Sequence, residues 1–321
     1  MYLNVKFYTM ILLLAVILFF QACASKPIHL PSEQLVLYSN NDKMDLINKY
    51  MPGFLVENHN VDYNKISTVR ARLDSNKEEI YMDMNKASVY TQVRKFKTKN
   101  ALYTNLIYRV HFKETPHEYL TYGKNIGLFI IITLDVNNEP LLYTTVHTCG
   151  CYLAFIPTGN MKQSFYPNNW SNQLQYIYGE SLPSIIEYKN DSLLTFLLRK
   201  DTHRIKDVLM LSKKNINRYY KITLENKPLN SLENIVINNN KSISFFESNG
   251  VRKDYVKNSF KPWEKLFISW LAFDLKVGED KRLGVNKADG VSFYTSLKPW
   301  AQDASDMRDF ASFLRYWGWK L

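Results

Sequence analysis

Residues 128–147, LFIIITLDVNNEPLLYTTVH, decide how this chain is expected to fold. Residues 128–134 are almost all apolar and rich in isoleucine, which favours a β-strand. Residues 135–140 (DVNNEP) are typical of a turn, and residues 141–147 return as a second strand. The stretch therefore predicts a β-hairpin, and its nearly continuous apolar pattern indicates burial on both faces of a sheet.

The flanking sequence extends this hairpin into an antiparallel sheet. Residues 89–97 (VYTQVRKFK) alternate between two faces, and after a turn at Lys99 and Asn100 residues 102–112 form the partner strand. Further strands are predicted at 192–199, 204–211, 219–224 and 242–246. Periodicity does not decide whether the aromatic-rich residues 260–275 are strand or helix.

Two helices are predicted, one over residues 42–50 and one near the C-terminus. Residues 42–50 (DKMDLINKY) form a short helix with Asp42 as its N-cap. A helix over 306–317, capped by Asp303 or Ser305 and closed by Gly318, presents one apolar side that seals the sheet. The tryptophans nearby provide an alternative reading, an aromatic patch that contacts a membrane: Trp300, Trp317 and Trp319.

The expected fold class is therefore α+β, a single domain that is rich in antiparallel β-meander and has a C-terminal capping helix. A break near residues 159–182 that separates two lobes is the alternative. The chain of 321 residues has 41 Lys and Arg against 30 Asp and Glu, a net charge of +11. Because the basic residues are dispersed among acidic ones, we expect no nucleic-acid partner.

Residues 1–22 have the pattern of a signal peptide. Lys6 precedes an unbroken apolar run over 10–20, which is too short to span a bilayer as a helix but fits the apolar region of an export signal. The remainder is therefore expected to act outside the cytoplasm.

The residues that follow, Ala22-Cys23-Ala24, give this region a resemblance to bacterial lipoprotein precursors. The resemblance implies that the chain is cut before Cys23 and that this cysteine carries diacylglycerol on its sulfur and a further acyl chain, such as palmitate, on its amino group. It departs from the usual pattern at Phe20 and Gln21. Residues 23–31 are then a lipidated tether to the membrane, and residues 32–321 the exported domain.

The resemblance also implies a localisation. In Gram-negative lipoproteins Asp after the lipidated cysteine commonly retains the protein at the inner membrane, so Ala24 implies the outer membrane. Two alternatives remain: cleavage before Ser25, which gives a soluble periplasmic or secreted protein, and an uncleaved anchor.

His147, Cys149 and Cys151 form the segment with the most reactive chemistry. If the preceding strand continues, the three side chains share one face, and they could bind Zn²⁺ or Cu⁺. The fourth ligand would come from elsewhere, with His111 or His117 as candidates. No cofactor is otherwise implied.

Other chemistries compete for the same three residues. In an oxidising compartment Cys149 and Cys151 can form a disulfide, either structural or active in redox exchange. A cysteine nucleophile assisted by His147 is a further alternative, as is a buried turn without chemistry. The segment 149–158 is also similar to one in uncharacterised proteobacterial lipoproteins, which implies no activity. The sequence thus predicts a lipid-anchored envelope protein, non-enzymatic, with metal binding and thiol catalysis as alternatives, and it leaves protein partners open.

Overall fold

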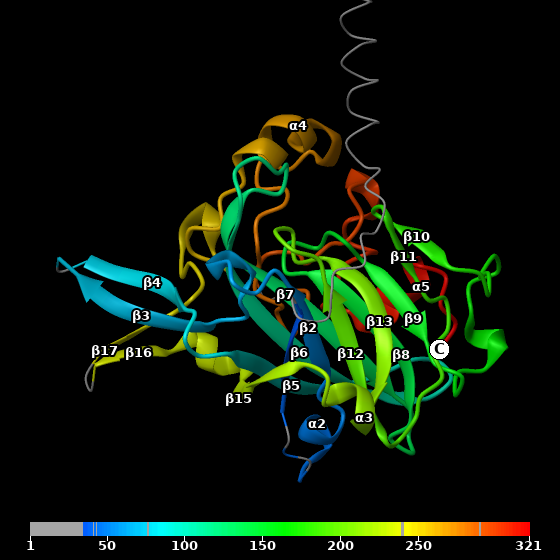
Figure 1. The fold of residues 1–321 in the computed structure, drawn as a ribbon. Coiled ribbons are helices and arrows are strands. Elements are labelled where there is room, and N and C mark those ends of the chain that lie inside the picture. The colour runs from blue at the N-terminus through cyan, green and yellow to red at the C-terminus, as the bar shows by residue number, and fades with distance from the viewer. Residues whose placement is uncertain (1–34, 41, 43, 76, 239–240, 289) are drawn as a thin grey trace, which may run out of the picture.

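The computed structural model describes residues 35–321 except 41, 43, 76, 239, 240 and 289. The expected signal peptide 1–22, Cys23 and the tether 23–31 lie outside the described residues. The described part is rich in strands, which form several mostly antiparallel sheets (Figure 1).

The largest sheet contains the predicted hairpin. Its six strands have the order β15-β5-β6-β7-β8-β9, so β5 to β9 form an antiparallel meander. In the turn of the hairpin the Asp135 carboxylate accepts hydrogen bonds from the backbone N–H groups of Asn137 and Glu139 at 2.9 and 2.8 Å. The strands are β5 (Ser88–Lys97), β6 (Leu102–Thr115), β7 (Gly123–Leu134), β8 (Pro140–His147), β9 (Ala154–Pro157) and β15 (Glu225–Pro228).

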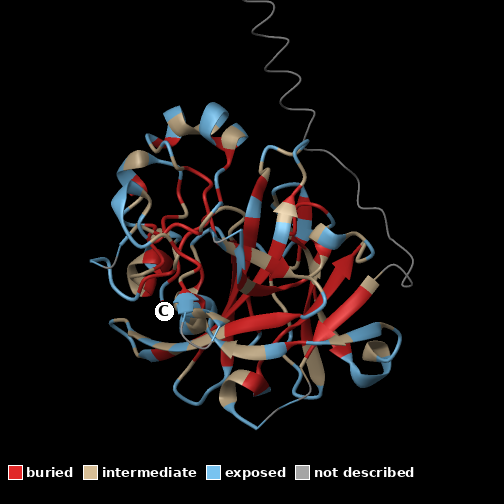
Figure 2. Cartoon of the chain, turned by 90° about the vertical axis from the view of Figure 1, so that its left-hand side faces the viewer, coloured by how far each residue is buried: buried red, intermediate tan, exposed pale blue. Residues whose placement is uncertain are grey.

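Both faces of this sheet are buried, as the apolar pattern of β7 predicts. Ile130 and Ile132 belong to the core on one face, whereas Phe129 and Ile131 belong to a second core on the other face. Figure 2 shows these central strands almost entirely buried. A strand covered on both sides gains no stability from alternating polar residues, which explains why its sequence is almost continuously apolar.

A second sheet covers the first face. Its five strands have the order β13-β12-β2-β1-β14, and β1 pairs in parallel with β14, as does β12 with β2. The sequence predicts β12, β13 and β14 but not β1 or β2. The strands are β1 (Leu35–Ser39), β2 (Gly53–Glu57), β12 (Ser192–Leu198), β13 (Ile205–Ser212) and β14 (Tyr220–Thr223).

Three two-stranded hairpins complete the described strands. They lie at the periphery of the large sheets, with β3 and β4 at one side in Figure 1. Their strands are β3 (Thr68–Asp74) with β4 (Lys77–Asp83), β10 (Gln175–Ile177) with β11 (Glu180–Leu182), and β16 (Ile235–Asn238) with β17 (Lys241–Ile243).

The helices are shorter than the sequence predicts. α2 (Leu46–Lys49) is capped by Asp45 rather than Asp42, and α3 (Lys213–Ile216) was not predicted. α5 (Phe310–Tyr316) is capped by Asp309, because the Ser305 hydroxyl and the Asp306 carboxylate bond the backbone of residues 293–296 instead. Short 3₁₀ turns occur at Asp62–Asn64, Gln163–Phe165, Leu229–Glu233, Gly250–Arg252 and Pro299–Ala301.

The C-terminal region covers the second face of the large sheet. Phe310, Phe313 and Leu314 of α5 pack in the same core as Phe129 and Ile131 of β7. The undecided stretch 260–275 contains α4 (Pro262–Ala272), which projects from the top of the molecule in Figure 1. Among the described residues, no helix has the length and apolar character needed to cross a bilayer.

Candidate functional site

The three predicted site residues His147, Cys149 and Cys151 meet in a tight turn. β8 ends at His147, whose backbone N–H donates to the carbonyl of Cys151 at 2.9 Å, while the N–H of Gly150 donates to the carbonyl of His147 at 2.8 Å. The prediction that a continuing strand aligns the three side chains is therefore wrong. The turn instead brings their ligand atoms within 4.8 Å of one another.

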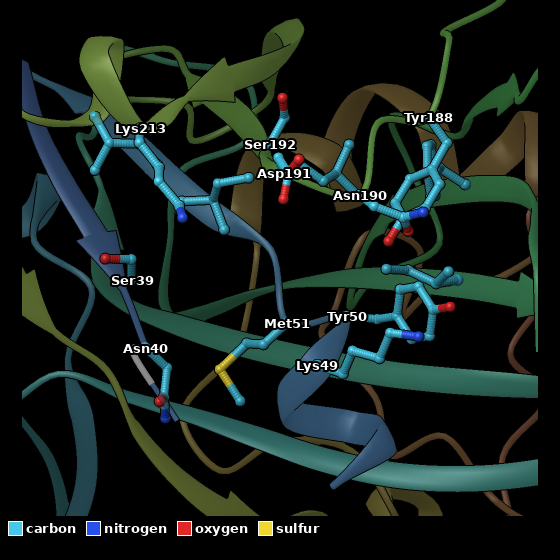
Figure 3. A pocket seen from close by; sticks show the side chains of 15 residues that line it. Ser39, Asn40, Lys49, Tyr50, Met51, Tyr188, Asn190, Asp191, Ser192 and Lys213 are labelled. Carbon is cyan, nitrogen blue, oxygen red and sulfur yellow. The ribbon is translucent and has the colours of Figure 1, made fainter. Parts of the chain in front are cut away.

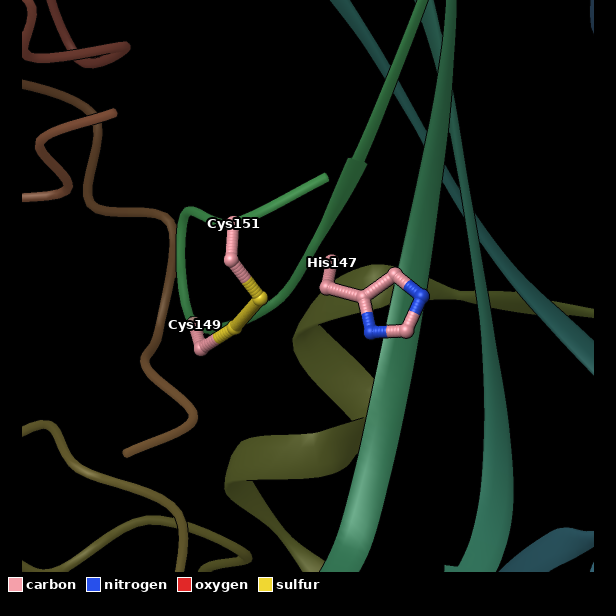
Figure 4. Close-up of side chains that lie close together, drawn as sticks. All are labelled: His147, Cys149 and Cys151. Atoms are coloured by element: carbon pink, nitrogen blue, oxygen red, sulfur yellow. A yellow bond between two sulfur atoms is a disulfide. The ribbon is translucent and has the colours of Figure 1, made fainter. Parts of the chain in front are cut away.

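The two sulfurs are joined. Cys149 and Cys151 form a disulfide, and the imidazole of His147 lies beside it (Figure 4). Cys149 is buried, and Cys151 is half-buried. Of the chemistries that the sequence left open, the disulfide is the one that the structure contains.

Gly150 allows the turn to form where it does. Its φ of +96° lies in the left-handed region, and a Cβ at this position would overlap the backbone carbonyl oxygen of Tyr294. The turn therefore packs directly against the backbone of the C-terminal segment, which only glycine permits.

Replacing Gly150 tests this contact. We expect Gly150→Ala to lower the free energy of unfolding by about 3 kcal/mol, the sum of left-handed strain and overpacking against a backbone atom. Gly250→Ala is the matched control, because Gly250 has a similar φ of +66° but nothing within 4 Å of the added Cβ. It should cost only about 1 kcal/mol. Equal losses in chemical denaturation would contradict the packing argument.

His147 is held as a neutral imidazole. Its side chain is buried and contacts the Tyr152 ring edge to face, with the ring centroids 4.8 Å apart. Burial, reinforced by the nearby charge of Lys261, lowers the pKa of His147 well below its ordinary value. Nε2 has no hydrogen-bond partner among the described residues. A neutral ring with one unbonded nitrogen is the form that binds metals.

The two candidate fourth ligands do not reach this turn. His111 pairs with Gly127 on β7, whereas His147 pairs with the next residue, Leu128, so the two imidazoles lie on opposite faces of the sheet. The Nε2 of His111 accepts a hydrogen bond from Arg109 at 2.9 Å. His117 lies at the surface, where its Nδ1 is 3.3 Å from Glu118.

The sequence did not predict that buried charges adjoin the turn. Lys261, Glu264 and Asp280 are all buried, with the Lys261 Nζ 3.5 Å from the Asp280 carboxylate and 3.7 Å from that of Glu264. We refer to these three residues as the ionic cluster. Burial raises the pKa of Glu264 even though Lys261 opposes the shift, whereas Asp280 and Glu264 overcome burial and raise the pKa of Lys261.

Asp280 connects the ionic cluster to the turn. Thr148 Oγ1 donates a hydrogen bond to Asp280 Oδ1, and the backbone N–H of Gly127 donates to the same oxygen at 3.3 Å. The N–H of Lys281 donates to the Thr148 carbonyl at 2.8 Å. The sequence indicates a loop around Gly278 and gives no sign that Asp280 is buried. In the structure, Gly278 lies directly against the Glu264 carboxylate.

A separate cleft lies between the two large sheets (Figure 3). Its volume is about 370 Å³, and one wall is formed by the loop before β12. Tyr143 is one of its lining residues, and the hydroxyl of this side chain is buried without a hydrogen-bond partner among the described residues. The other aromatic rings are Tyr50 and Tyr188, and Lys49, Lys213 and Asp191 contribute charge. Such a mixture of apolar walls and a few polar groups is typical of small-molecule binding.

The disulfide turn with its ionic cluster and the Tyr143 cleft are thus the two candidate sites of the described chain. The first is closed and strongly cross-linked, which suits a structural role. The second is open to solvent, which suits binding. Searches of protein-family models, curated proteins and solved structures found no match for this chain.

Proposed function

We propose that this chain is an exported protein of the bacterial cell envelope, held at a membrane by lipid on Cys23. In this proposal residues 32–321 form one α+β domain with a binding or structural role. The observation that carries the proposal is the Cys149–Cys151 disulfide, because such bonds persist mainly in oxidising compartments. The apolar run 10–20 that precedes Cys23 supports the same compartment.

A binding role is favoured over thiol catalysis. Cysteine catalysis requires a free thiolate next to a base, and in the described residues both sulfurs belong to one bond. The Tyr143 cleft offers a preformed place for a ligand. Its aromatic rings and its few charged side chains are the mixture that binds small molecules.

Mass spectrometry of the N-terminal peptide tests the anchor. We expect the native protein, purified from membranes, to begin at Cys23 with diacylglycerol and acyl mass, and Cys23→Ser to lack that mass. The Cys149→Ser/Cys151→Ser variant is the control and should keep it. A native N-terminus without acyl mass would contradict the proposal, and a chain beginning at Ser25 would indicate soluble export. For a Gram-negative host, Ala24 leads us to expect the outer-membrane fraction.

Reduction tests whether the disulfide stabilises the domain. We expect dithiothreitol to release two thiols and to lower the free energy of unfolding by only about 1–2 kcal/mol, because the bond closes a very short loop. The Cys149→Ser/Cys151→Ser variant should unfold identically with and without reductant. Two free thiols in the untreated native protein would contradict a disulfide in this compartment.

A second candidate function is binding of Zn²⁺ or Cu⁺ by the reduced turn. It is favoured by one observation: a ring nitrogen of His147 and the sulfurs of Cys149 and Cys151 lie within 4.8 Å of one another. Elemental analysis of protein purified with and without reductant decides the matter. One equivalent of metal under reducing conditions, lost in His147→Gln, would support it, whereas trace metal far below one equivalent would exclude it.

A further inference from the structure

α4 is an apolar helix that the other described residues leave largely exposed. Only Glu264 and Ala272 of its eleven residues are buried. Trp270 is 69% exposed and Phe273, which follows the helix, is 84% exposed. Figure 2 shows this helix at the top of the molecule mostly in the colours of exposed and half-buried residues. The exposed apolar side chains are Phe260, Trp263, Leu266, Phe267, Trp270, Leu271, Phe273 and Leu275.

Trp300 extends this surface. The side chain of Gln302 donates to the carbonyl of Ala272 at 2.8 Å, which holds the 3₁₀ turn Pro299–Ala301 beside the end of α4. Trp300 itself is 82% exposed. We call these nine side chains the α4 surface. Contiguous exposed apolar surface of this kind is rare on proteins that work alone in water, and it marks a contact site.

Within residues 257–276 the exposed charge is positive, which favours an anionic partner. Lys265 is exposed, and Lys257 and Lys276 are half-buried at its edges. Residues 257–276 contain two carboxylates: Glu264 is buried in the ionic cluster, and Asp274 accepts a hydrogen bond from the Tyr294 hydroxyl at 2.7 Å. Tryptophan, phenylalanine and leucine with flanking lysine are the composition of helices that lie in the headgroup region of a bilayer.

The α4 surface lies at the end of the molecule where the described chain begins. β1 starts at Leu35, which pairs with Glu57, and the Glu57 carboxylate accepts from the backbone N–H of Lys200 at 3.1 Å. The next residue, Asp201, accepts from the Tyr119 hydroxyl at 2.8 Å.

Tyr119 belongs to the loop between β6 and β7, and this loop also contacts α4. Its His117 carbonyl accepts a hydrogen bond from the Trp263 indole N–H at 3.0 Å. In Figure 1, α4 lies at the top and α2, which follows β1, lies at the bottom. No more than about 40 Å of extended chain separates Cys23 from Leu35. A lipid on Cys23 would therefore hold this end of the domain close to the bilayer.

We propose that the α4 surface inserts into the headgroup region of an anionic phospholipid bilayer, as a second contact besides the lipid anchor. The proposal rests on the anchor for its choice of membrane over a protein partner. α4 would lie parallel to the membrane plane, with its aromatic side chains buried and Lys265 directed toward phosphate groups. The contact would orient the domain, so that the Tyr143 cleft keeps one fixed direction relative to the membrane.

Tryptophan quenching tests the insertion. Full-length protein is reconstituted in vesicles of phosphatidylglycerol and phosphatidylethanolamine with brominated acyl chains, and its emission is compared with that in ordinary vesicles. Because three of the six tryptophans lie on the α4 surface, we expect bromine to remove up to about half of the emission. In Trp263→Phe/Trp270→Phe/Trp300→Phe, the remaining tryptophans should emit equally in both. Equal emission of the wild type in both kinds of vesicle would overturn the proposal.

A second set of variants tests the surface as a whole. Trp270→Ser/Phe273→Ser/Leu275→Ser should lose at least half of the quenching, while Val93→Ser/Val236→Ser, at exposed apolar positions elsewhere, should keep it. Cross-linking of two copies through α4 in place of quenching would also overturn the proposal. If the protein carries acyl mass but bromine does not quench it, the α4 contact is contradicted and the anchor stands. If bromine quenches a protein without acyl mass, only the anchor is contradicted.

Discussion

Acidification from pH 7.5 to pH 5 should lower the free energy of unfolding, by at most about 2 kcal/mol for each buried histidine. Three buried histidines cause this loss: His111, His147 and His203. Burial lowers the pKa of each, to about 3 for His203 and well below the ordinary value of 6.5 for the other two. Positive neighbours add to the shift, Arg109 for His111 and Lys261 for His147 and His203.

The sign of the effect follows from which state takes up protons. Between the lowered pKa values and 6.5 the unfolded chain binds protons and the folded chain does not, so stability falls as the pH falls. The contribution is complete above pH 6.5. At pH 5 a histidine whose folded-state pKa is about 3, as for His203, has lost about 2 kcal/mol.

Urea denaturation across this pH range measures the loss. His147→Gln removes one of the three groups, so the loss at pH 5 should be smaller than in the wild type. His117→Gln is the control, because His117 is exposed, and it should leave the profile unchanged. A wild-type stability that stays flat down to pH 5 would show that these imidazoles accept protons in the folded protein.

Replacing Lys261 by Met should lower the free energy of unfolding by about 3–5 kcal/mol at pH 7. The change leaves the Glu264 and Asp280 carboxylates buried beside the disulfide turn without the cation that lies 3.7 and 3.5 Å from them. Since Asp280 also accepts from Thr148, the turn itself should loosen. Thermal and chemical denaturation both measure the loss.

The triple variant Lys261→Met/Glu264→Gln/Asp280→Asn separates charge imbalance from packing. The amide that replaces the Asp280 carboxylate would still offer an oxygen to Thr148 and Gly127, while no buried charge remains in the ionic cluster. We expect it to recover most of the stability, because buried ion pairs as a whole contribute little net stability. A triple variant as unstable as Lys261→Met would show that packing, not charge, causes the loss.

The local pattern predicted the central sheet well. The hairpin over 128–147 and the preceding strands are present nearly as predicted. Their apolar pattern shows which faces are buried, and hydrogen bonds to the Asp135 carboxylate stabilise the turn locally. The prediction missed β1 and β2, which are short and pair with strands distant in sequence. It also misplaced the caps of α2 and α5, since several Asp and Ser residues near each helix can act as a cap.

The candidate site was predicted in composition but not in surroundings. The reactive trio of His147, Cys149 and Cys151 is evident from its residue types alone. Its neighbours Lys261 and Asp280 are far away in sequence, and charged residues carry no local signal of burial. The aromatic-rich stretch 260–275 left helix and strand undecided, and the structure forms α4 there with most of its aromatic side chains at the surface.

By itself, the sequence determined the antiparallel hairpin and the closeness of His147, Cys149 and Cys151 along the chain. Each depends on residues that are neighbours along the chain, where apolar periodicity and turn propensity act directly. The tertiary structure alone decided that His111 lies across the sheet from His147, that Asp280 joins the turn to Lys261, and that α4 stays uncovered. These features arise from the packing of segments that are distant in sequence. The burial of a side chain there depends on which other segment packs against it, and no local pattern encodes that.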